Sequence, residues 1–480
     1  MTRAERRTLP VAAGPAGPAA PGTARKPRAD GPPPHGRRRR RRHRRSSPPP
    51  PPLAERGVRV TLYERQAPPR RAAPEARAHH PSGTRTPVTM SAASTPSVRP
   101  VLQHLRGLLL HVPTTGCAGL TGPARLPAAA PARPTASRDS FRHVPRTPPW
   151  SALGFAALSP SFTLPGPVRH MDPVAALPLL DVRVPEIYDR LDHTAAHDFL
   201  DAVRFPDKAR HLAFEVFSRS FFADPRQLSA AGDGADVPTS TSSAPPRACC
   251  STCPARPSPP PLWHPLADYL LRHGAELRTS TAVEHITPTR DGGHRVVTDA
   301  DERRHDGVVL ALDTAGLRRV VAGSDHLGDA PWRERIARLR NAPAFLVTRL
   351  WLDRPVAPGR PGFLGTAGFP TLDNISVLER WEDEAARWAG RTGGSVVELH
   401  AYAVPGSASW DVEEKRLIEQ MHRVYPETRG ATVVDARHEW RADCPLFAVG
   451  GYRDRPTVRT PPTRVSWSPA TWSAPACPWR

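Results

Sequence analysis

The chain has 480 residues, of which 39% are hydrophobic, with 61 prolines and a formal net charge of +21. Its length is enough for one large or two ordinary domains with a real core. The charge is concentrated in residues 1–150, which hold 28 Lys/Arg against six Asp/Glu and 28 of the prolines. The remainder is close to neutral, so the overall charge is weak evidence for an acidic partner of the folded part.

No targeting or membrane-spanning segment is evident in the sequence. There is no run of roughly 18 apolar residues, so no transmembrane helix is predicted. The N-terminus also lacks the apolar region of a signal peptide. We therefore expect a cytoplasmic protein, and leave open a peripheral contact with a membrane.

The first third of the chain changes character twice. Residues 1–52 are rich in Ala, Pro and Arg, include the run RRRRRRHRR at 37–45, and are predicted to be disordered. Residues 53–66 differ, because Leu53 to Gly57 reads as the end of a helix with a glycine C-cap, and Val58–Glu64 alternates as a short strand. Residues 67–150 return to low complexity and are also predicted to be disordered.

Residues 151–463 have the patterns of a folded protein, apart from an irregular stretch at 231–261, and 464–480 form an irregular tail. Helices are expected at 209–222, at 262–273 with a cap at Gly274, and at 412–424. Strands are expected at 276–281, 295–297, 308–312, 345–352 and 395–402. The continuous apolar run 308–312 is typical of a strand buried in a parallel sheet. These elements predict an α/β protein.

Glu64 is the first candidate binding residue. An acidic residue that ends the second strand of a dinucleotide-binding fold accepts hydrogen bonds from a ribose hydroxyl. A strand that ends in Glu is a weak signal alone, and the glycine-rich loop expected about 20 residues upstream is replaced by the arginine run. A one-base shift of the reading frame turns that run into VVVGGGIAG, a strand and a glycine loop.

Two further segments, 239–254 and 465–480, also become protein-like after a shift of frame. We therefore hypothesise that the reading frame of a GC-rich gene is broken in these segments and at 37–45. The arginine run could instead bind nucleic acid or an anionic surface, but no aromatic residues are interleaved with it. Cys250 and Cys253 form a single CxxC without a second pair, so no metal site is predicted. Cys444 is interpreted as structural.

Five sequence blocks carry a family resemblance. They are 209–222 (ARHLAFEVFSRSFF), 262–270 (LWHPLADYL), 345–355 (FLVTRLWLDRP), 373–381 (DNISVLERW) and 444–453 (CPLFAVGGYR). Together with residues 53–66, they resemble the isorenieratene synthases, which aromatise carotene rings and belong to the phytoene-desaturase-like flavoproteins. The resemblance covers roughly 151–229 and 261–463, over half of the chain.

The resemblance implies a Rossmann-like FAD-binding domain and a mixed α+β substrate domain that receives a carotenoid. FAD would accept hydride while the protein supplies a dry, apolar slot. It implies that Glu64 and Arg65 meet the adenosine ribose and that the region of Val283 meets the adenine side. Ala311 and Leu312, within 308–313, would lie beneath the flavin. It assigns no catalytic acid or base, no metal and no specific nucleic acid.

Aromatic residues could form the walls of a carotenoid slot, although aromatic side chains at such spacings are more often plain core. The residues concerned are Phe214, Phe217, Phe221, Phe222, Phe345, Trp351, Phe363 and Trp381. Three alternatives remain open at this point. They are another amine-oxidase-type or protoporphyrinogen-oxidase-like flavoprotein, a frameshifted relic unable to bind FAD, and a basic nucleic-acid-associated protein.

Overall fold

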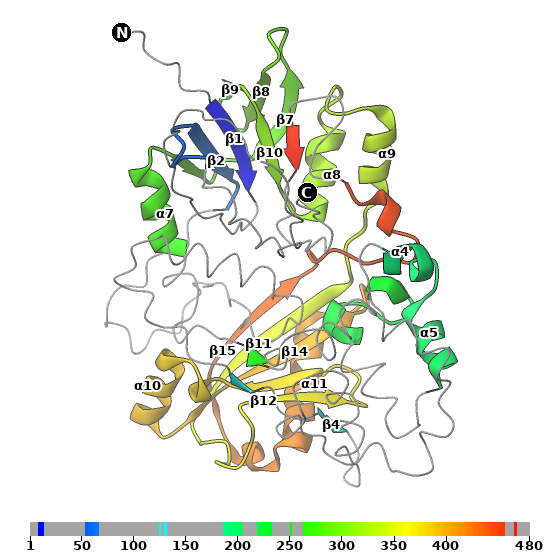
Figure 1. Cartoon of the computed structure of the whole chain (residues 1–480). Helices are drawn as coiled ribbons and strands as arrows, with labels where there is room; N and C mark the ends of the chain where they lie inside the picture. The colour runs from blue at the N-terminus through cyan, green and yellow to red at the C-terminus, as the bar shows by residue number, and fades with distance from the viewer. Residues whose placement is uncertain are drawn as a thin grey trace, which may run out of the picture.

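The computed structural model describes residues 8–13, 53–66, 124–125, 129–131, 186–204, 218–232, 250–251, 263–456 and 465–467. These residues form two halves, each built around a sheet, as Figure 1 shows. A parallel sheet with its helices occupies the upper half of the view, and a larger, mostly antiparallel sheet occupies the lower half. The predicted mixture of helices and sheets is confirmed.

The upper sheet has five strands in the order β16-β10-β1-β2-β6, and every neighbouring pair is parallel. The strands are β1 (Thr8–Ala13), β2 (Arg59–Glu64), β6 (Glu276–Thr279), β10 (Val308–Ala311) and β16 (Val465–Trp467). A central strand with parallel neighbours on both sides is typical of open α/β sheets, which bind ligands at the carboxyl ends of their strands.

The prediction of disorder over residues 1–52 is wrong for Thr8–Ala13, which form the central strand β1. Proline at position 10 weakens the strand pattern, and the hydrogen bonds of β1 come from strands distant in sequence. Three short strands also lie in segments predicted to be irregular, namely β3 (Ala124–Arg125), β4 (Ala129–Pro131) and β5 (Cys250–Ser251). The arginine run and most of the helix expected at 209–222 lie outside the described residues.

Helices and a small antiparallel sheet surround the parallel sheet. The helices are α7 (Trp263–Arg272), α8 (Thr314–Ala322) and α9 (Ala330–Arg338), and the three-stranded sheet contains β7 (Val283–Pro288), β8 (His294–Thr298) and β9 (Glu302–His305). The glycine cap predicted after α7 is confirmed, since Gly274 has φ +77°. The strand predicted at 295–297 lies in β8, which pairs with β7 and β9 and not with the next predicted strand, β10.

The lower sheet has six strands in the order β15-β11-β14-β13-β12-β4. Its strands besides β4 are β11 (Ala344–Leu352), β12 (Phe363–Ala367), β13 (Asn374–Val377), β14 (Ser395–Val404) and β15 (Val433–Arg441). Two helices accompany it, α10 (Asp383–Thr392) and α11 (Trp410–Val424). The strands predicted at 345–352 and 395–402 and the helix at 412–424 are thus confirmed.

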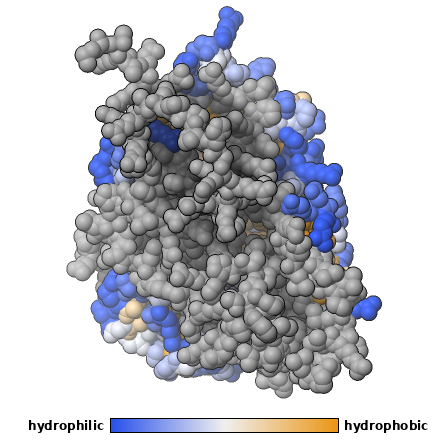
Figure 2. Space-filling view, viewed as in Figure 1, coloured by the Kyte–Doolittle hydropathy of each residue, from blue (hydrophilic) through white to orange (hydrophobic). Residues whose placement is uncertain are grey.

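Short helices complete the described structure. They are α4 (Glu186–Leu191), α5 (Ala196–Val203) and the 3-10 turns η5 (Ser218–Phe221), η6 (Leu378–Arg380), η7 (Pro426–Gly430) and η8 (Tyr452–Asp454). Figure 2 shows that the described residues at the rim of this face are mainly hydrophilic. Each half has its own core, with Leu310 and Trp332 fully buried in the upper half and Leu350 and Leu417 in the lower.

Candidate active site

Glu64 lies at the carboxyl edge of the parallel sheet, as the last residue of β2. Its Oε1 accepts a hydrogen bond from the backbone N–H of Gln66 at 2.8 Å. Burial raises the pKa of Glu64 above its ordinary value, and the charge of Asp313, just after β10, adds to the increase. Two carboxylates from strands on either side of β1 therefore interact at this edge.

The other residues predicted for the adenosine half lie beside Glu64. Arg65 follows it directly and is exposed. The backbone N–H of Thr281 donates to the carbonyl of Glu64 at 3.0 Å, which holds the start of β7 against the end of β2. Val283, the first residue of β7, packs against the core of this half. The structure thus brings Glu64, Arg65 and the region of Val283 together.

The residues predicted to lie beneath the flavin end β10. Ala311 is the last residue of that strand and is 5% exposed. Leu312 follows and packs, partly buried, against the same core. Asp313 then caps α8 by accepting a hydrogen bond from the backbone N–H of Gly316.

The adenosine half of FAD fits this edge. The half-buried Glu64 carboxylate is an acceptor in the position where open α/β folds bind a ribose. Glu64 and Arg65 would hold the ribose, and Ala311 and Leu312 would support the flavin.

A cavity of about 540 Å³ lies where the chain passes from the upper half to the lower. Its described lining residues are Arg226, Gln227, Arg340, Asn341, Ala342, Pro343, Gly406, Leu446 and Val449. Two crossing segments form one wall, since an isolated bridge pairs Asn341 with Pro445 and the N–H of Leu446 donates to the carbonyl of Arg340 at 2.9 Å.

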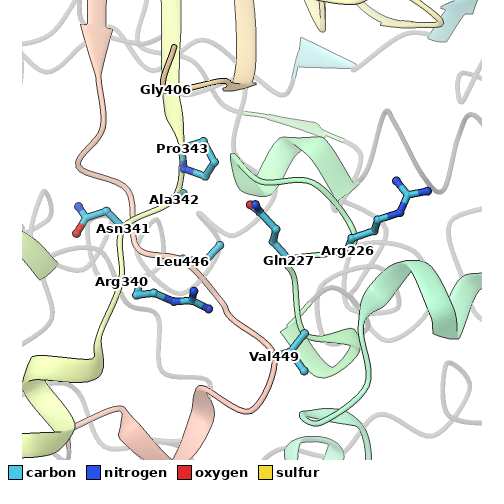
Figure 3. Close-up of a pocket in the computed structure, with 9 residues that line it drawn as sticks. All are labelled: Arg226, Gln227, Arg340, Asn341, Ala342, Pro343, Gly406, Leu446 and Val449. Carbon is cyan, nitrogen blue, oxygen red and sulfur yellow. The ribbon is translucent and has the colours of Figure 1, made fainter. Parts of the chain in front are cut away.

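Figure 3 shows how the side chains lie around this cavity. Gln227, Arg340, Leu446 and Val449 point toward its centre, whereas Arg226 points away. Asn341 also points away, and its Nδ2 donates to the carbonyl of Ala442 at 2.9 Å. The interior thus combines apolar walls with two polar groups, a combination typical of small-molecule sites.

The lower sheet has one apolar face and one polar face. On the apolar face, side chains such as Leu350 and Leu399 pack with α11. On the opposite face, Arg349 donates to Glu398 at 2.6 and 3.0 Å and to Glu382 at 3.3 Å. We call the side of the sheet that bears Arg349 and Glu398 the polar face.

The two carboxylates that share Arg349 differ in their pKa values. Burial opposes ionisation of Glu398, but the hydrogen bond from His400 and the charge of Arg349 lower its pKa to about 2. For Glu382, burial raises the pKa to about 7, which Arg349 offsets only in part. Glu398 is therefore the permanent anion of this group, and Glu382 titrates near neutral pH.

The sequence analysis did not identify the polar face. Its signal is the period-two spacing of Glu398, His400 and Tyr402, which usually indicates a solvent-exposed face of a strand. All three residues are at most 2% exposed. Only the tertiary structure distinguishes a buried polar face from a solvent-exposed one.

Cys444, which the sequence analysis interpreted as structural, is a free thiol in the described part of the chain. Burial and the charge of Asp443 raise its pKa to about 12, so it is a poor nucleophile near neutral pH. Within the described ranges, no group of three or more His, Cys, Asp or Glu could hold a metal ion. Nor does any described helix combine the length and hydrophobicity needed to span a bilayer.

Solved structures share the fold at low sequence identity. A triple mutant of putrescine oxidase superposes with a TM-score of 0.59 at 13% identity, covering 96% of this chain and 93% of that one. An oxidoreductase from Methanosarcina mazei gives 0.56 at 13% identity over 87% and 90% of the two chains. These likenesses establish an oxidoreductase-type fold and nothing about substrate.

Sequence comparisons are more specific. A carotenoid phi-ring synthase of Streptomyces griseus is 55% identical over 417 residues, which are 86% of this chain and 78% of that protein. A carotenoid phi-ring synthase of Chlorobaculum tepidum is 33% identical over 171 residues, 35% of this chain and 26% of that protein. The family model for flavin-containing amine oxidoreductases matches residues 127–473. The chain therefore belongs to the flavin-containing amine oxidoreductase family, as an FAD-dependent oxidoreductase of the branch that contains carotenoid phi-ring synthases.

Proposed function

We propose that this protein oxidises the cyclic end group of a carotene, a β-ionone ring, to an aromatic ring. The observation that carries the proposal is the 55% identity over 86% of the chain to the phi-ring synthase of Streptomyces griseus. Identity at this level over most of the chain argues for the same class of substrate. The resemblance of the blocks at 345–355 and 373–381 to ring-aromatising enzymes points the same way.

We infer that FAD supplies the oxidising power, because a bound flavin accepts the hydride that each two-electron oxidation removes. The protein's own part is to bind and orient. Glu64 and Arg65 would fix the ribose, the region of Val283 would contact the adenine, and Ala311 and Leu312 would lie beneath the ring system. These assignments are supported by their common location at the carboxyl edge of the parallel sheet.

The cavity between the halves is the proposed place for the ring end of the substrate. Ala342, Pro343, Leu446 and Val449 contribute apolar lining that a hydrocarbon ring could contact. Because carotenes partition into bilayers, we infer that the protein collects its substrate at a membrane surface. Co-sedimentation with vesicles that contain carotene would test that contact.

The proposal is tested by expressing the chain from resequenced DNA and purifying it with added FAD. A yellow protein that bleaches anaerobically with a β-ring carotene, and releases an aromatic-ring product, would support the proposal. Putrescine serves as a control substrate for amine oxidation. A flavin-loaded protein that bleaches with the amine and not with the carotene would overturn it, and a colourless protein would favour the relic.

A further inference from the structure

Three side chains on the polar face of the lower sheet form a continuous hydrogen-bonded chain. Nε2 of His400 lies 2.9 Å from Oε1 of Glu398, and Nδ1 of His400 lies 2.9 Å from the hydroxyl of Tyr402. Glu398 and His400 are fully buried and Tyr402 is 2% exposed. Burying polar groups is costly unless each is paired, so this chain is a specific feature of the site.

The charge of Glu398 sets the direction of the chain. Despite burial, the hydrogen bond from His400 and the charge of Arg349 hold the pKa of Glu398 at about 2, so Glu398 is an acceptor only. Nε2 of His400 must then carry the proton, which leaves Nδ1 to accept from the hydroxyl of Tyr402. Asn374 completes the arrangement, because its Nδ2 donates to the same hydroxyl oxygen at 3.1 Å.

Asn374 is buried beside the same hydroxyl. The residue is 4% exposed, and its Oδ1 has no hydrogen-bond partner among the described residues. A buried acceptor without a donor is rare in folded proteins.

The backbone around Tyr402 is strained. Ala403 has φ +50° and Phe222, whose ring centroid lies 4.9 Å from that of Tyr402, has φ +62°. Left-handed backbone is unfavourable for a residue that carries a side chain. The pairing of β11 with β14 also shifts register between Ala344 and Leu346, close to this point. Strain and register shifts of this kind are typical of functional sites, where they aim a side chain.

The Tyr402 end lies next to the cavity. The ring of Phe222 packs at 4.9 Å against both Phe345 and Tyr402. These three residues share one packed cluster with Ala342 and Leu446, which line the cavity. A ring held in the cavity is therefore separated from Tyr402 by this cluster at most.

We propose that Glu398, His400 and Tyr402 form a proton-accepting relay for the aromatisation, with the Tyr402 hydroxyl as its terminal group. The inference rests on the proposed function, since the ring loses one hydride and one proton in each of the two oxidations that, together with a methyl migration, make it aromatic. An apolar site contains little water to take that proton. Asn374 and Arg349 are positioning residues, the first for Tyr402 and the second for Glu398.

The step balances without a further reactant. After hydride loss, a C–H bond of the cationic ring breaks, and its electron pair forms a ring double bond. The proton passes to the oxygen of Tyr402 while the phenolic proton moves to Nδ1 of His400. The resulting imidazolium is paired with the carboxylate of Glu398. The relay resets when His400 releases its proton after turnover.

Several charged groups face the relay from the elements packed around it. They are Arg349 on β11, Glu382 before α10, Arg219 on η5, Asp373 before β13, and Glu439 and Arg441 on β15.

The test compares the wild-type holoenzyme with Tyr402→Phe and His400→Gln under anaerobic conditions, with the FAD-loaded enzyme in excess over a β-ring carotene, because two flavins must be reduced for each aromatic ring that forms. Flavin bleaching reports hydride loss, and extracted product reports aromatisation. We expect bleaching to persist while aromatic product forms about 10²–10⁴-fold more slowly. Tyr63→Phe is the matched control, because Tyr63 is a buried tyrosine 2.9 Å from His305 in the upper half.

A second readout does not need turnover. With 15N-labelled histidine, the ring shifts of His400 should show the proton on Nε2 in the wild type and lose that signature in Glu398→Gln. The relay is overturned if Tyr402→Phe aromatises carotene at the wild-type rate, or if the proton is found on Nδ1. Failure of the wild type to bleach or aromatise would instead refute the proposed function.

Discussion

The two sheets place their polar chemistry differently. The parallel sheet carries Glu64 and Asp313 at the ends of its strands, and its interior is apolar. The antiparallel sheet carries Arg349, Glu398 and His400 in the middle of its strands, buried on one face. Strand ends expose backbone and side chains to a ligand at little cost, whereas a polar strand centre must be fully paired before it can be buried.

We therefore expect the upper half to bind the nucleotide part of the cofactor and the lower half to determine the reaction. Changes at the strand ends should mainly affect cofactor binding. Changes on the polar face should affect stability and the reaction itself. The following substitutions test that division.

The largest effect is expected for Arg349→Met, which leaves Glu398 and Glu382 buried without their shared cation. Breaking a buried ion pair by removing one partner costs about 3–5 kcal/mol. Urea denaturation should show this loss in the free energy of unfolding. Arg295→Met is the control, because it removes an exposed ion pair with Glu302 that is worth about 1 kcal/mol or less. Equal losses in the two variants would contradict a stabilising role for the polar face.

A pH-dependent effect of similar size is expected from Glu382, whose pKa is raised to about 7 by burial. The folded state keeps a proton that the unfolded state releases at lower pH. The resulting stabilisation is complete below the unfolded pKa and is lost as pH rises through the folded value. Between pH of about 5 and 8, the wild type should lose on the order of 3 kcal/mol that Glu382→Gln keeps.

The control for that experiment is Glu419→Gln, which changes an exposed residue on α11. Its unfolding free energy should follow the wild-type pH dependence. An identical slope in Glu382→Gln and the control would show that Glu382 is not buried in its neutral form.

At the other sheet, Glu64→Ala should weaken FAD binding with little effect on folding. Hydrogen bonds to a charged acceptor are worth about 1.5–3 kcal/mol, so the Kd for FAD should rise about 10- to 150-fold. Titration of the apoprotein by flavin fluorescence measures this change. Glu302→Ala, on exposed β9, provides the control. An unchanged Kd would show that Glu64 does not contribute to FAD binding.

The smallest expected effect is on stability and FAD affinity when either of two helix N-caps is replaced. Asp313 and Asp329 each accept a hydrogen bond from the first turn of a helix, α8 and α9 respectively. Alanine at either position should cost about 0.5–2 kcal/mol of stability. Only Asp313→Ala should also change FAD affinity, because only Asp313 raises the pKa of Glu64. The same shift in both variants would mean that the cap, and not the charge, is responsible.

The sequence predicted much of the fold where local pattern and tertiary structure agree. The strand ending at Glu64, helix α7 with its Gly274 cap, and strand β14 follow from periodicity and capping. Strand β1 was missed because its pairing is entirely non-local. The relay was missed because alternating polar residues have the same pattern whether water or protein covers them. The placement of FAD came from family resemblance and not from a motif.

The central claim is that a flavin-loaded protein oxidises a carotene ring. Its most direct test is one anaerobic titration of the FAD-loaded protein with a β-ring carotene, followed by flavin absorbance and product mass. The account predicts that the flavin bleaches in proportion to added carotene and that the product has lost hydrogen and gained an aromatic ring. A flavin that stays oxidised, with unchanged carotene recovered, would contradict it.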